Sequence, residues 1–552
     1  MNYNSYSFWL FYLAVLVLYW RLDHRRQNKL MLVASYVFYG FWDYRFLFLI
    51  LLSTVIDFIG GLGVAGIELP RRRLRGLGVF LVASALLLCG GVRYAELWQG
   101  LLRLDGAQML SALPTGLRDL AVPIGTAAVA LVYGALLPHL YRLPAEHRRR
   151  CFLAISMVAN LVILGFFKYC DFFIASLHGL LSALGLPVSL STLGILLPAG
   201  ISFYTFQAMS YTIDIYRNEV APTDDFADFA LFVCFFPHLV AGPIMRAHTL
   251  LPQVVQPRRL QPGAVEEGAV LVGLGLFKKI VIADNMAPIA NAVFFRFAEG
   301  KWMDMSGAEA LAGVYAFAFQ IYGDFSGYSS IARGISKWLG FELVQNFRMP
   351  YLATSPSDFW RRWHISLSSW LRDYLYIPLG GNRGGARRQY RNLMLTMLLG
   401  GLWHGASWTF VAWGFYHGLL LCLFRLFRIP DAVSGVGWIA GARRLGRVVL
   451  MFHLTCIGWL LFRADTFSTA WNLAVLVLTR FTVTPMFLSA MATIAFYNLV
   501  LFLLEWALDG ENRIERLLDA AWPVQGAAYA YVVLMILLFH AGQAYEFIYF
   551  QF

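Results

Sequence analysis

Apolar runs alternate with short polar stretches along almost the whole chain, and most runs approach the length of a membrane-spanning helix. About 20 apolar residues in a helix cross a hydrocarbon core of ~30 Å, and roughly eleven to fourteen runs come near that length. They lie near residues 8–20, 30–42, 45–59, 77–91, 119–141, 151–167, 193–213, 228–245, 268–283, 308–323, 393–424, 447–462, 485–507 and 526–541. The run at 393–424 is long enough for two helices. Several runs are short or broken by glycine and proline, so we expect re-entrant elements, which need surrounding protein or a water-filled cavity.

Composition supports a membrane assignment. The 552 residues are 59% hydrophobic and only 14% charged, whereas soluble domains carry about 25% charged residues. The mean hydropathy is +0.61. The chain is therefore predicted to be an all-α polytopic membrane protein, with one integral membrane domain over residues 1–552.

The formal charge of +12 comes from clustered basic residues between the apolar runs. The clusters lie at Arg21–Lys29, Arg71–Arg75 and Arg142–Arg150. This placement follows the positive-inside rule and marks cytoplasmic loops, so nucleic acid is excluded as a partner and the lipid bilayer is expected instead. The uncharged start MNYNSYS is predicted to lie outside, and no cleavable signal is evident.

Known soluble-enzyme motifs are absent from the sequence. The six cysteines lie mostly in apolar runs without C-x-x-C spacing, which is typical of buried structural thiols. There is no zinc signature, P-loop, G-x-G-x-x-G or G-x-S-x-G nucleophile elbow. GDFSG (Gly323–Gly327) has its serine in the wrong place for an elbow. We therefore expect neither a metal site nor a serine-hydrolase mechanism within this chain.

Ionisable residues concentrate between Phe359 and Gly405. His364 lies in FWRRWHISLSSWLRDYLYIPLGGNRGG, and His404 lies forty residues later in LLGGLWHGASWTF. Charged and titratable side chains at bilayer depth are costly, so a functional role is the default hypothesis for them. Asp324 and His238, also in apolar context, are expected to be structural: a hydrogen-bonded buried carboxylate and part of a broken helix.

The ordered motifs of this chain resemble the membrane-bound O-acyltransferases, in particular the bacterial branch of alginate O-acetyltransferases and teichoic acid D-alanyl transferases. The matching segments are Leu196–Arg217, Phe235–Arg246, Ile321–Gly334, Asn346–Gly385 and Arg391–Gly418. Residues 196–418 are thus the predicted catalytic core. The stretch from about 71 to 150 adds apolar segments relative to alginate-type relatives, which leaves the polysaccharide open.

The resemblance implies a helical ring around a central tunnel in the bacterial inner membrane. It implies acetyl-CoA as the cytoplasmic acyl donor and a separate periplasmic SGNH-hydrolase-like acetyltransferase as the partner that delivers the acetyl group to an exopolysaccharide such as alginate or cellulose. Acetyl-histidine formation and direct transfer to the partner both remain open.

His404 is the residue that the resemblance places at the transfer centre. Acyl transfer from a thioester needs a base of near-neutral pKa, which imidazole supplies. The flanking glycines predict a turn or a helix start. His364 is expected to bind or orient, on a single helical face with Trp360, Leu367 and Leu371. A structural histidine bridging helices is the alternative for each.

The donor site is predicted from the polar residues around these histidines. Arginine recognises phosphate in a bidentate manner, and coenzyme A carries phosphates at its nucleotide end. The predicted donor-binding residues are Arg361, Arg362, Arg372, Asn382 and Arg383. Arg–Asp pairing and positive-inside topology are the competing explanation.

Three other functions compete with acetyl transfer. D-alanyl transfer from a carrier-protein thioester is the alternative within the enzyme class. A polytopic polysaccharide transporter usually contains two related halves, but neither histidine motif recurs in the sequence. A membrane scaffold would not need the clustered His, Trp and Arg.

The aromatic C-terminus EFIYFQF is expected to lie at the membrane interface.

Overall fold

The computed structural model describes residues 2–114, 116–186, 188–239, 242–435, 437–541 and 545–548. Within these residues the regular secondary structure is helical, without a β-strand. The chain forms two compact units. The first comprises mainly Leu10–Val240 and Met245–Arg258, and the second comprises mainly Arg259–Phe552 with two short segments, Asn2–Trp9 and Ala241–Ile244.

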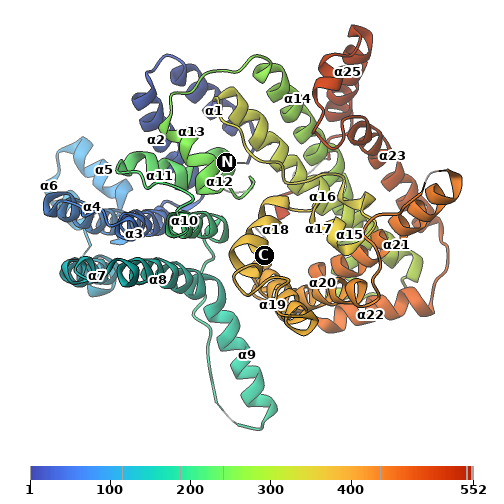
Figure 1. The fold of residues 1–552 in the computed structure, drawn as a ribbon, viewed down its shortest axis with the longest axis horizontal. Helices are drawn as coiled ribbons and strands as arrows, with labels where there is room; N and C mark the ends of the chain where they lie inside the picture. Colours follow the sequence, from blue (N-terminus) through green and yellow to red (C-terminus); the bar gives the residue numbers. More distant parts are fainter. Residues whose placement is uncertain are drawn as a thin grey trace. The chain divides into compact units, whose positions relative to one another are not determined.

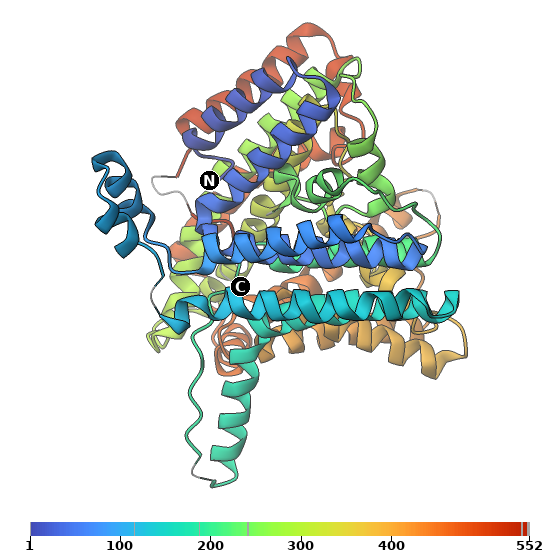
Figure 2. The ribbon, with the colours of Figure 1, turned by 90° about the vertical axis from the view of Figure 1, so that its left-hand side faces the viewer.

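The first unit contains the N-terminal helices (Figures 1 and 2). They are α1 (Tyr6–Tyr19, continuing from the second unit), α2 (His24–Asp43), α3 (Leu47–Ala65), α4 (Arg71–Cys89), α5 (Tyr94–Arg103), α6 (Gly106–Ser111), α7 (Leu117–Tyr141), α8 (Ala145–Leu164), α9 (Cys170–Ala183), α10 (Ile201–Tyr216), α11 (Phe226–Cys234), α12 (Phe236–Leu239) and α13 (Ala247–Val255). A π-turn at Gly165–Tyr169 joins α8 to α9, and α9 extends away from the α7–α8 pair (Figures 1 and 2).

Small residues and one buried carboxylate hold α3 against its neighbours. A Cβ at Gly61 or Gly63 would overlap the rings of Tyr211 and Phe152, so only glycine permits this approach of α3 to α10 and α8. Asp57 is fully buried and accepts hydrogen bonds from both Ser156 and Asn160. Its oxygens are therefore satisfied without a cation, as a buried carboxylate requires.

The second unit contains the predicted catalytic core (Figure 1). Its helices are α14 (Ala264–Leu276), α15 (Asp284–Ala298), α16 (Gly307–Trp338), α17 (Pro356–Trp360), α18 (Ile365–Leu371), α19 (Ala386–His404), α20 (Trp408–Leu426), α21 (Trp438–Arg463), α22 (Phe467–Thr479), α23 (Pro485–Ala507), α24 (Glu515–Leu518) and α25 (Trp522–Leu538). A π-helix at Phe277–Ala283 joins α14 to α15.

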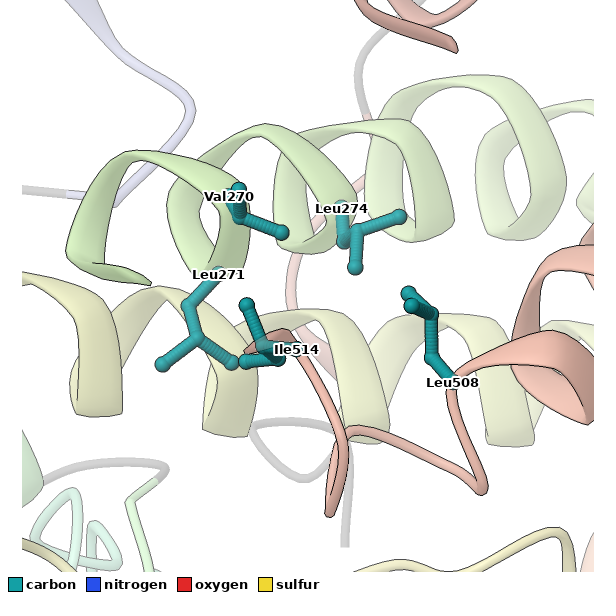
Figure 3. Packing of buried hydrophobic residues seen from close by; sticks show 5 residues of the cluster. All are labelled: Val270, Leu271, Leu274, Leu508 and Ile514. Carbon is teal, nitrogen blue, oxygen red and sulfur yellow. The ribbon is translucent and has the colours of Figure 1, made fainter. Parts of the chain in front are cut away.

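Helix α16 is the buried centre of this unit and packs closely against α14. A Cβ at Gly275 would lie 2.6 Å from the carbonyl oxygen of Gly327, and one at Gly327 would lie 2.7 Å from that of Gly275. Gly323 and Gly327 of GDFSG lie within α16, where they permit close helix packing. Val270, Leu271 and Leu274 of α14 also pack against Leu508 and Ile514 (Figure 3).

Two buried lysines, Lys278 and Lys279, are each neutralised by two carboxylates. Lys278 lies 2.9 Å from Glu505 and 2.7 Å from Glu511, and Arg333 pairs with Glu511 at 2.6 Å. Lys279 pairs with Asp284 and Asp324, both at 2.8 Å. Asp324 also accepts a hydrogen bond from the backbone of Ile548. The predicted structural role of Asp324 fits this geometry, with a lysine as its main partner.

Among the described residues, six helical stretches are long and apolar enough to cross a membrane, or seven if the bent pair α4–α5 counts as one span. The protein is therefore a multi-pass membrane protein, with fewer full-length spans than the eleven to fourteen expected. The difference arises from shorter apolar helices, such as α1 and α25, and from helices such as α16 that carry buried polar residues. In the C-terminal segment EFIYFQF, Phe547 and Ile548 are buried within the protein, which contradicts the expected interfacial position for these two residues. Residues 549–552 lie outside the described residues.

Candidate active site

His404 is the last residue of α19, at the tight corner between α19 and α20. The expectation of a turn or helix start was wrong, because Gly400 and Gly401 continue the helix. A Cβ on Gly401 would overlap the carbonyl oxygen of Phe410, and one on Gly414 would overlap that of Met397. The glycines thus let α19 and α20 cross at backbone contact, which fixes the position of His404.

The imidazole of His404 is buried among aromatic rings. Ring centroids lie 5.0 Å from Trp403, 4.9 Å from Trp413 and 5.5 Å from Phe462, each nearly perpendicular to the imidazole. Only 3% of the residue is exposed. Edge-to-face packing of this kind restricts ring rotation and excludes bulk water, so the imidazole of His404 has a fixed orientation in a dry environment.

His364 occupies a strained backbone position between α17 and α18. Its φ is +42°, in the left-handed region, and it is the N-cap of α18. The predicted single helical face was wrong, because α17 ends at Trp360 and a new helix begins at Ile365. The non-glycine left-handed residue is a local strain that surrounding contacts must maintain.

Asn346 supplies those contacts. Its backbone carbonyl accepts a hydrogen bond from the Ile365 amide at 2.9 Å, and its side-chain oxygen accepts one from Ser366 Oγ at 2.6 Å. The His364 ring packs edge-on against Phe325, with centroids 4.6 Å apart. The residue is thereby fixed on both its backbone and its ring.

One indole connects the two predicted histidines. The ring of Trp403 lies 6.0 Å from His364 and 5.0 Å from His404, centroid to centroid. The structure therefore places both histidines in the same aromatic cluster, although forty residues separate them in sequence. Their surroundings differ, because His364 lies in a strained turn and His404 at a helix end.

A third buried histidine, which the sequence analysis did not single out, belongs to this cluster. His417 on α20 lies 4.8 Å from Trp413 and 5.2 Å from Trp360, and it stacks on Phe359 at 5.9 Å. It stands four residues after Trp413, on the same helical face. The sequence shows this spacing, because His417 lies in an apolar run one helical turn after Trp413. The spacing alone could have identified His417 as a candidate member of the cluster.

Indole N–H groups in this cluster provide hydrogen-bond donors. Among the described residues, Nε1 of Trp360 and Nε1 of Trp413 are buried and have no acceptor. A Cβ at Gly458 would lie 2.7 Å from His417 Nε2 and 3.5 Å from Trp413 Nε1. Both nitrogens therefore lie close to the backbone of α21 at a residue that has no side chain. Buried donors without an acceptor suit stabilisation of an oxyanion.

Three of the predicted donor-binding arginines form ion pairs. Arg361 pairs with Asp431 at 2.6 Å, Arg362 with Asp358 at 2.8 Å, and Arg372 with Asp373 at 2.6 Å. Partial burial opposes ionisation of Asp431, but hydrogen bonds from Arg361 and Ser355 outweigh it and hold the pKa of that carboxyl below its usual range. The side chains of Arg361 and Arg372 are mostly exposed. Ion pairs at such exposed positions contribute little to stability, so they do not prevent either arginine from binding a phosphate.

Asn382 and Arg383 differ from the other predicted residues. Asn382 Oδ1 accepts hydrogen bonds from Tyr376 at 2.5 Å, Gln389 at 2.7 Å and Arg425 at 3.3 Å. Its visible role is to close the loop between the π-helix at Arg372–Tyr376 and α19. Arg383 is exposed on that loop.

A pocket of about 300 Å³ lies beside the histidine cluster. It is lined by Ser357, Trp360, Arg361, Ile365, Ser368, Ser369, Leu371, Arg372, Tyr376, Leu393, Thr396, Met397, Leu421 and Arg425. Arg361 and Arg372 are thus brought together, with Arg425 as an addition that the sequence analysis missed. Arg362, Asn382 and Arg383 do not line it. Trp360 forms part of the wall and also contacts Trp413 and His417.

Apolar spanning helices and a buried histidine cluster beside an arginine-lined pocket define an integral membrane enzyme. Comparison with known sequences agrees: the profile of the membrane-bound O-acyltransferase family matches residues 217–429, which include His364, His404 and His417. The chain is 36% identical over 476 residues to the probable alginate O-acetylase AlgI of Azotobacter vinelandii, covering 86% of this chain and 77% of that protein.

Two further relatives support the same family. The probable alginate O-acetylase AlgI of Pseudomonas aeruginosa is 36% identical over 477 residues, covering 86% of this chain and 74% of that protein. The peptidoglycan O-acetyltransferase of Helicobacter pylori is 36% identical over 357 residues, covering 58% of this chain and 63% of that protein. The chain belongs to the membrane-bound O-acyltransferase family and is a membrane-bound acyltransferase.

Proposed function

We propose that this protein transfers an acetyl group from acetyl-CoA at the cytoplasmic face of the bacterial inner membrane towards an exopolysaccharide. Relatives named for alginate and peptidoglycan O-acetylation support a polysaccharide as the final acceptor. The observation that carries the proposal is the position of His404, buried in an aromatic cluster next to a pocket with arginines on an apolar wall.

The donor fits the pocket by its chemistry. Coenzyme A combines phosphates with a long, largely apolar arm, and the pocket combines Arg361, Arg372 and Arg425 with leucine, isoleucine and methionine side chains. Guanidinium groups bind the phosphates, and the arm runs along the apolar wall towards Trp360. Trp360 is where the pocket meets the histidine cluster, so the thioester is delivered there.

His404 then acts as the general base. The acceptor hydroxyl attacks the thioester carbonyl while His404 takes its proton, and the carbonyl oxygen gains negative charge that the indole N–H groups of Trp360 and Trp413 stabilise. The tetrahedral intermediate collapses with cleavage of the C–S bond. The imidazolium returns the proton to the leaving thiolate, which gives free coenzyme A and an acetyl ester.

A periplasmic partner receives the acetyl group. The sequence contains no elbow serine, so delivery to the polymer is assigned to a separate SGNH-hydrolase-like acetyltransferase, whose serine is the acceptor hydroxyl. Alginate and cellulose are the candidate polymers.

The test uses the full-length protein in nanodiscs with acetyl-CoA labelled in the acetyl group. Wild type should release coenzyme A and pass label to the partner, and His404→Gln should lower this rate by about 10²- to 10⁴-fold, as expected for loss of a general base. His453→Gln, which removes an exposed histidine outside the cluster, is the control. Normal turnover by His404→Gln contradicts the assignment. Turnover only with an acyl-carrier-protein thioester identifies a D-alanyl-type enzyme.

A further inference from the structure

A large groove lies in the first unit, remote in sequence from the histidine cluster. Its volume is about 980 Å³, at the upper end of the ~300–1,000 Å³ typical of small-molecule sites. It is lined by Ile59, Glu68, Leu69, Arg71, Leu74, Arg75, Gly78, Val79, Val82, Ala83, Leu86, Ala127, Ala130, Leu131, Gly134, Ala135, Leu137, Pro138 and Tyr141. Most of these residues lie on α4 and α7, which run side by side in Figure 2, within the 71–150 stretch.

The groove has one polar end and one apolar end. Arg71 and Arg75 lie on the first turns of α4, and Glu68 just precedes it, whereas the remainder of α4 in the groove is apolar up to Leu86. Gly78 and Gly134 leave room in the groove, since a Cβ on Gly134 would have no neighbour within 4 Å. The positive-inside rule places the arginine end at the cytoplasmic face.

The polar end is prepared for an anion. Among the described residues neither Arg71 nor Arg75 has an ion-pair partner, and their two charges exceed the single charge of Glu68. Helix α4 begins at Arg71 after Pro70 without a side-chain cap. Its first backbone N–H groups therefore add to the positive potential at this end.

The dimensions match one leaflet of a bilayer. From Arg71 to Leu86, α4 rises by about 22 Å at ~1.5 Å per residue. Half of a bilayer with its headgroup region is about 20–22 Å thick. A molecule with its phosphate at Arg71 and Arg75 would thus have its chains at the depth of Val79, Val82 and Leu86.

We propose that the α4–α7 groove binds an anionic glycerophospholipid of the cytoplasmic leaflet, with its phosphate at Arg71 and Arg75 and its acyl chains between α4 and α7. A transmembrane helix of a partner protein would also fill an apolar groove. The phospholipid fits better because an unpaired arginine pair and a helix N-terminus lie at one end of the groove, where a lipid headgroup carries its charge.

Native mass spectrometry of the full-length protein, purified in mild detergent and then incubated with phosphatidylglycerol, tests the proposal. We expect one tightly retained phosphatidylglycerol per chain. Gly134→Leu fills the groove and should lower retention at least fivefold. Gly125→Leu is the matched control, because Gly125 lies on the same helix, equally free of neighbours but outside the groove lining.

A second pair of variants tests the charge. Arg71→Gln with Arg75→Gln should lower retention at least fivefold, whereas Arg72→Gln with Arg73→Gln removes the same charge outside the groove lining and should leave retention unchanged. Phosphatidylcholine should be retained less than phosphatidylglycerol, and inorganic phosphate should not displace the lipid. Equal effects of lining and control variants, equal retention of both lipids, displacement by phosphate, or a polypeptide in place of the lipid would each overturn the proposal.

Discussion

His404 and His417 are held by the same indole: the ring of Trp413 lies 4.9 Å from His404 and 4.8 Å from His417. His404 ends α19, whereas Trp413 and His417 both lie on α20, so the contact between Trp413 and His404 links the two helices and the contact with His417 is within α20. This arrangement makes His417 a positioning residue for the proposed base rather than a group in contact with the donor.

His417→Phe should therefore lower kcat by about tenfold while leaving the KM for acetyl-CoA within about twofold, because an orientation defect raises only the barrier of the transfer step. Steady-state kinetics in nanodiscs measures both constants. The matched comparison is His404→Phe, which should abolish transfer. A rise in KM without a change in kcat would show instead that His417 belongs to the donor site.

Gly458→Ala tests the close approach of α21 to this cluster. The new methyl group would lie 2.7 Å from His417 Nε2, so the imidazole or the helix must move. Overpacking of this kind destabilises by about 1–3 kcal/mol, and we expect a lower thermal unfolding temperature together with reduced transfer. Gly446→Ala, on the same helix with no neighbour within 4 Å, should be neutral. Unchanged stability and activity of Gly458→Ala would contradict the geometry.

Arg372→Gln and Arg425→Gln should each raise the KM for acetyl-CoA by about 10- to 100-fold, since a hydrogen bond to a charged group contributes ~1.5–3 kcal/mol. The kcat should change little, because phosphate binding is equal in the ground and transition states. Arg383→Gln, outside the pocket lining, is the comparison. Higher salt should weaken binding of coenzyme A to wild type more than to the variants. An equal rise in KM for Arg383→Gln would extend the donor site to the 382–383 loop.

Glu511→Gln should destabilise the second unit by about 3 kcal/mol, because removal of one partner leaves buried positive charge uncompensated. Glu511 pairs with both Lys278 and Arg333, and Glu505 alone then remains for Lys278. Thermal unfolding in detergent gives the measurement. Asp509→Asn, which breaks the exposed pair with Arg348, should change stability by less than about 1 kcal/mol. Similar effects of the two variants would show that the buried cluster has no special role.

The positions of helices and of the main histidine motif followed from the sequence alone. Apolar runs of near-membrane length predicted most helices. The run at 393–424, which is long enough for two helices, contains most of α19 and α20. These features depend on local composition and spacing, which a single sequence displays directly. The buried nature of His364 and His404 was likewise evident from the apolar residues around them.

The helix break at His364 depended on tertiary contacts. The residues from Trp360 to Leu371 have the spacing of one amphipathic helix, yet Asn346 binds the backbone after His364 and holds a left-handed turn. No local preference predicts that conformation for histidine, because its stabilising hydrogen bonds come from a segment about twenty residues earlier.

The sequence thus determined an all-helical membrane protein and pointed to His364 and His404. The tertiary structure decided which groups meet: His417 joins the cluster through Trp413, Arg425 joins Arg361 and Arg372 in one pocket, and Glu511 neutralises Lys278. The pocket and the Lys278–Glu511 pair each bring together residues from separate segments of the chain, whereas His417 and Trp413 share α20. Hydrophobic periodicity specifies which face of a helix is buried, but the element that covers this face depends on how whole helices pack. In this chain, helix packing depends on glycines such as Gly401 and Gly414, which permit backbone contact.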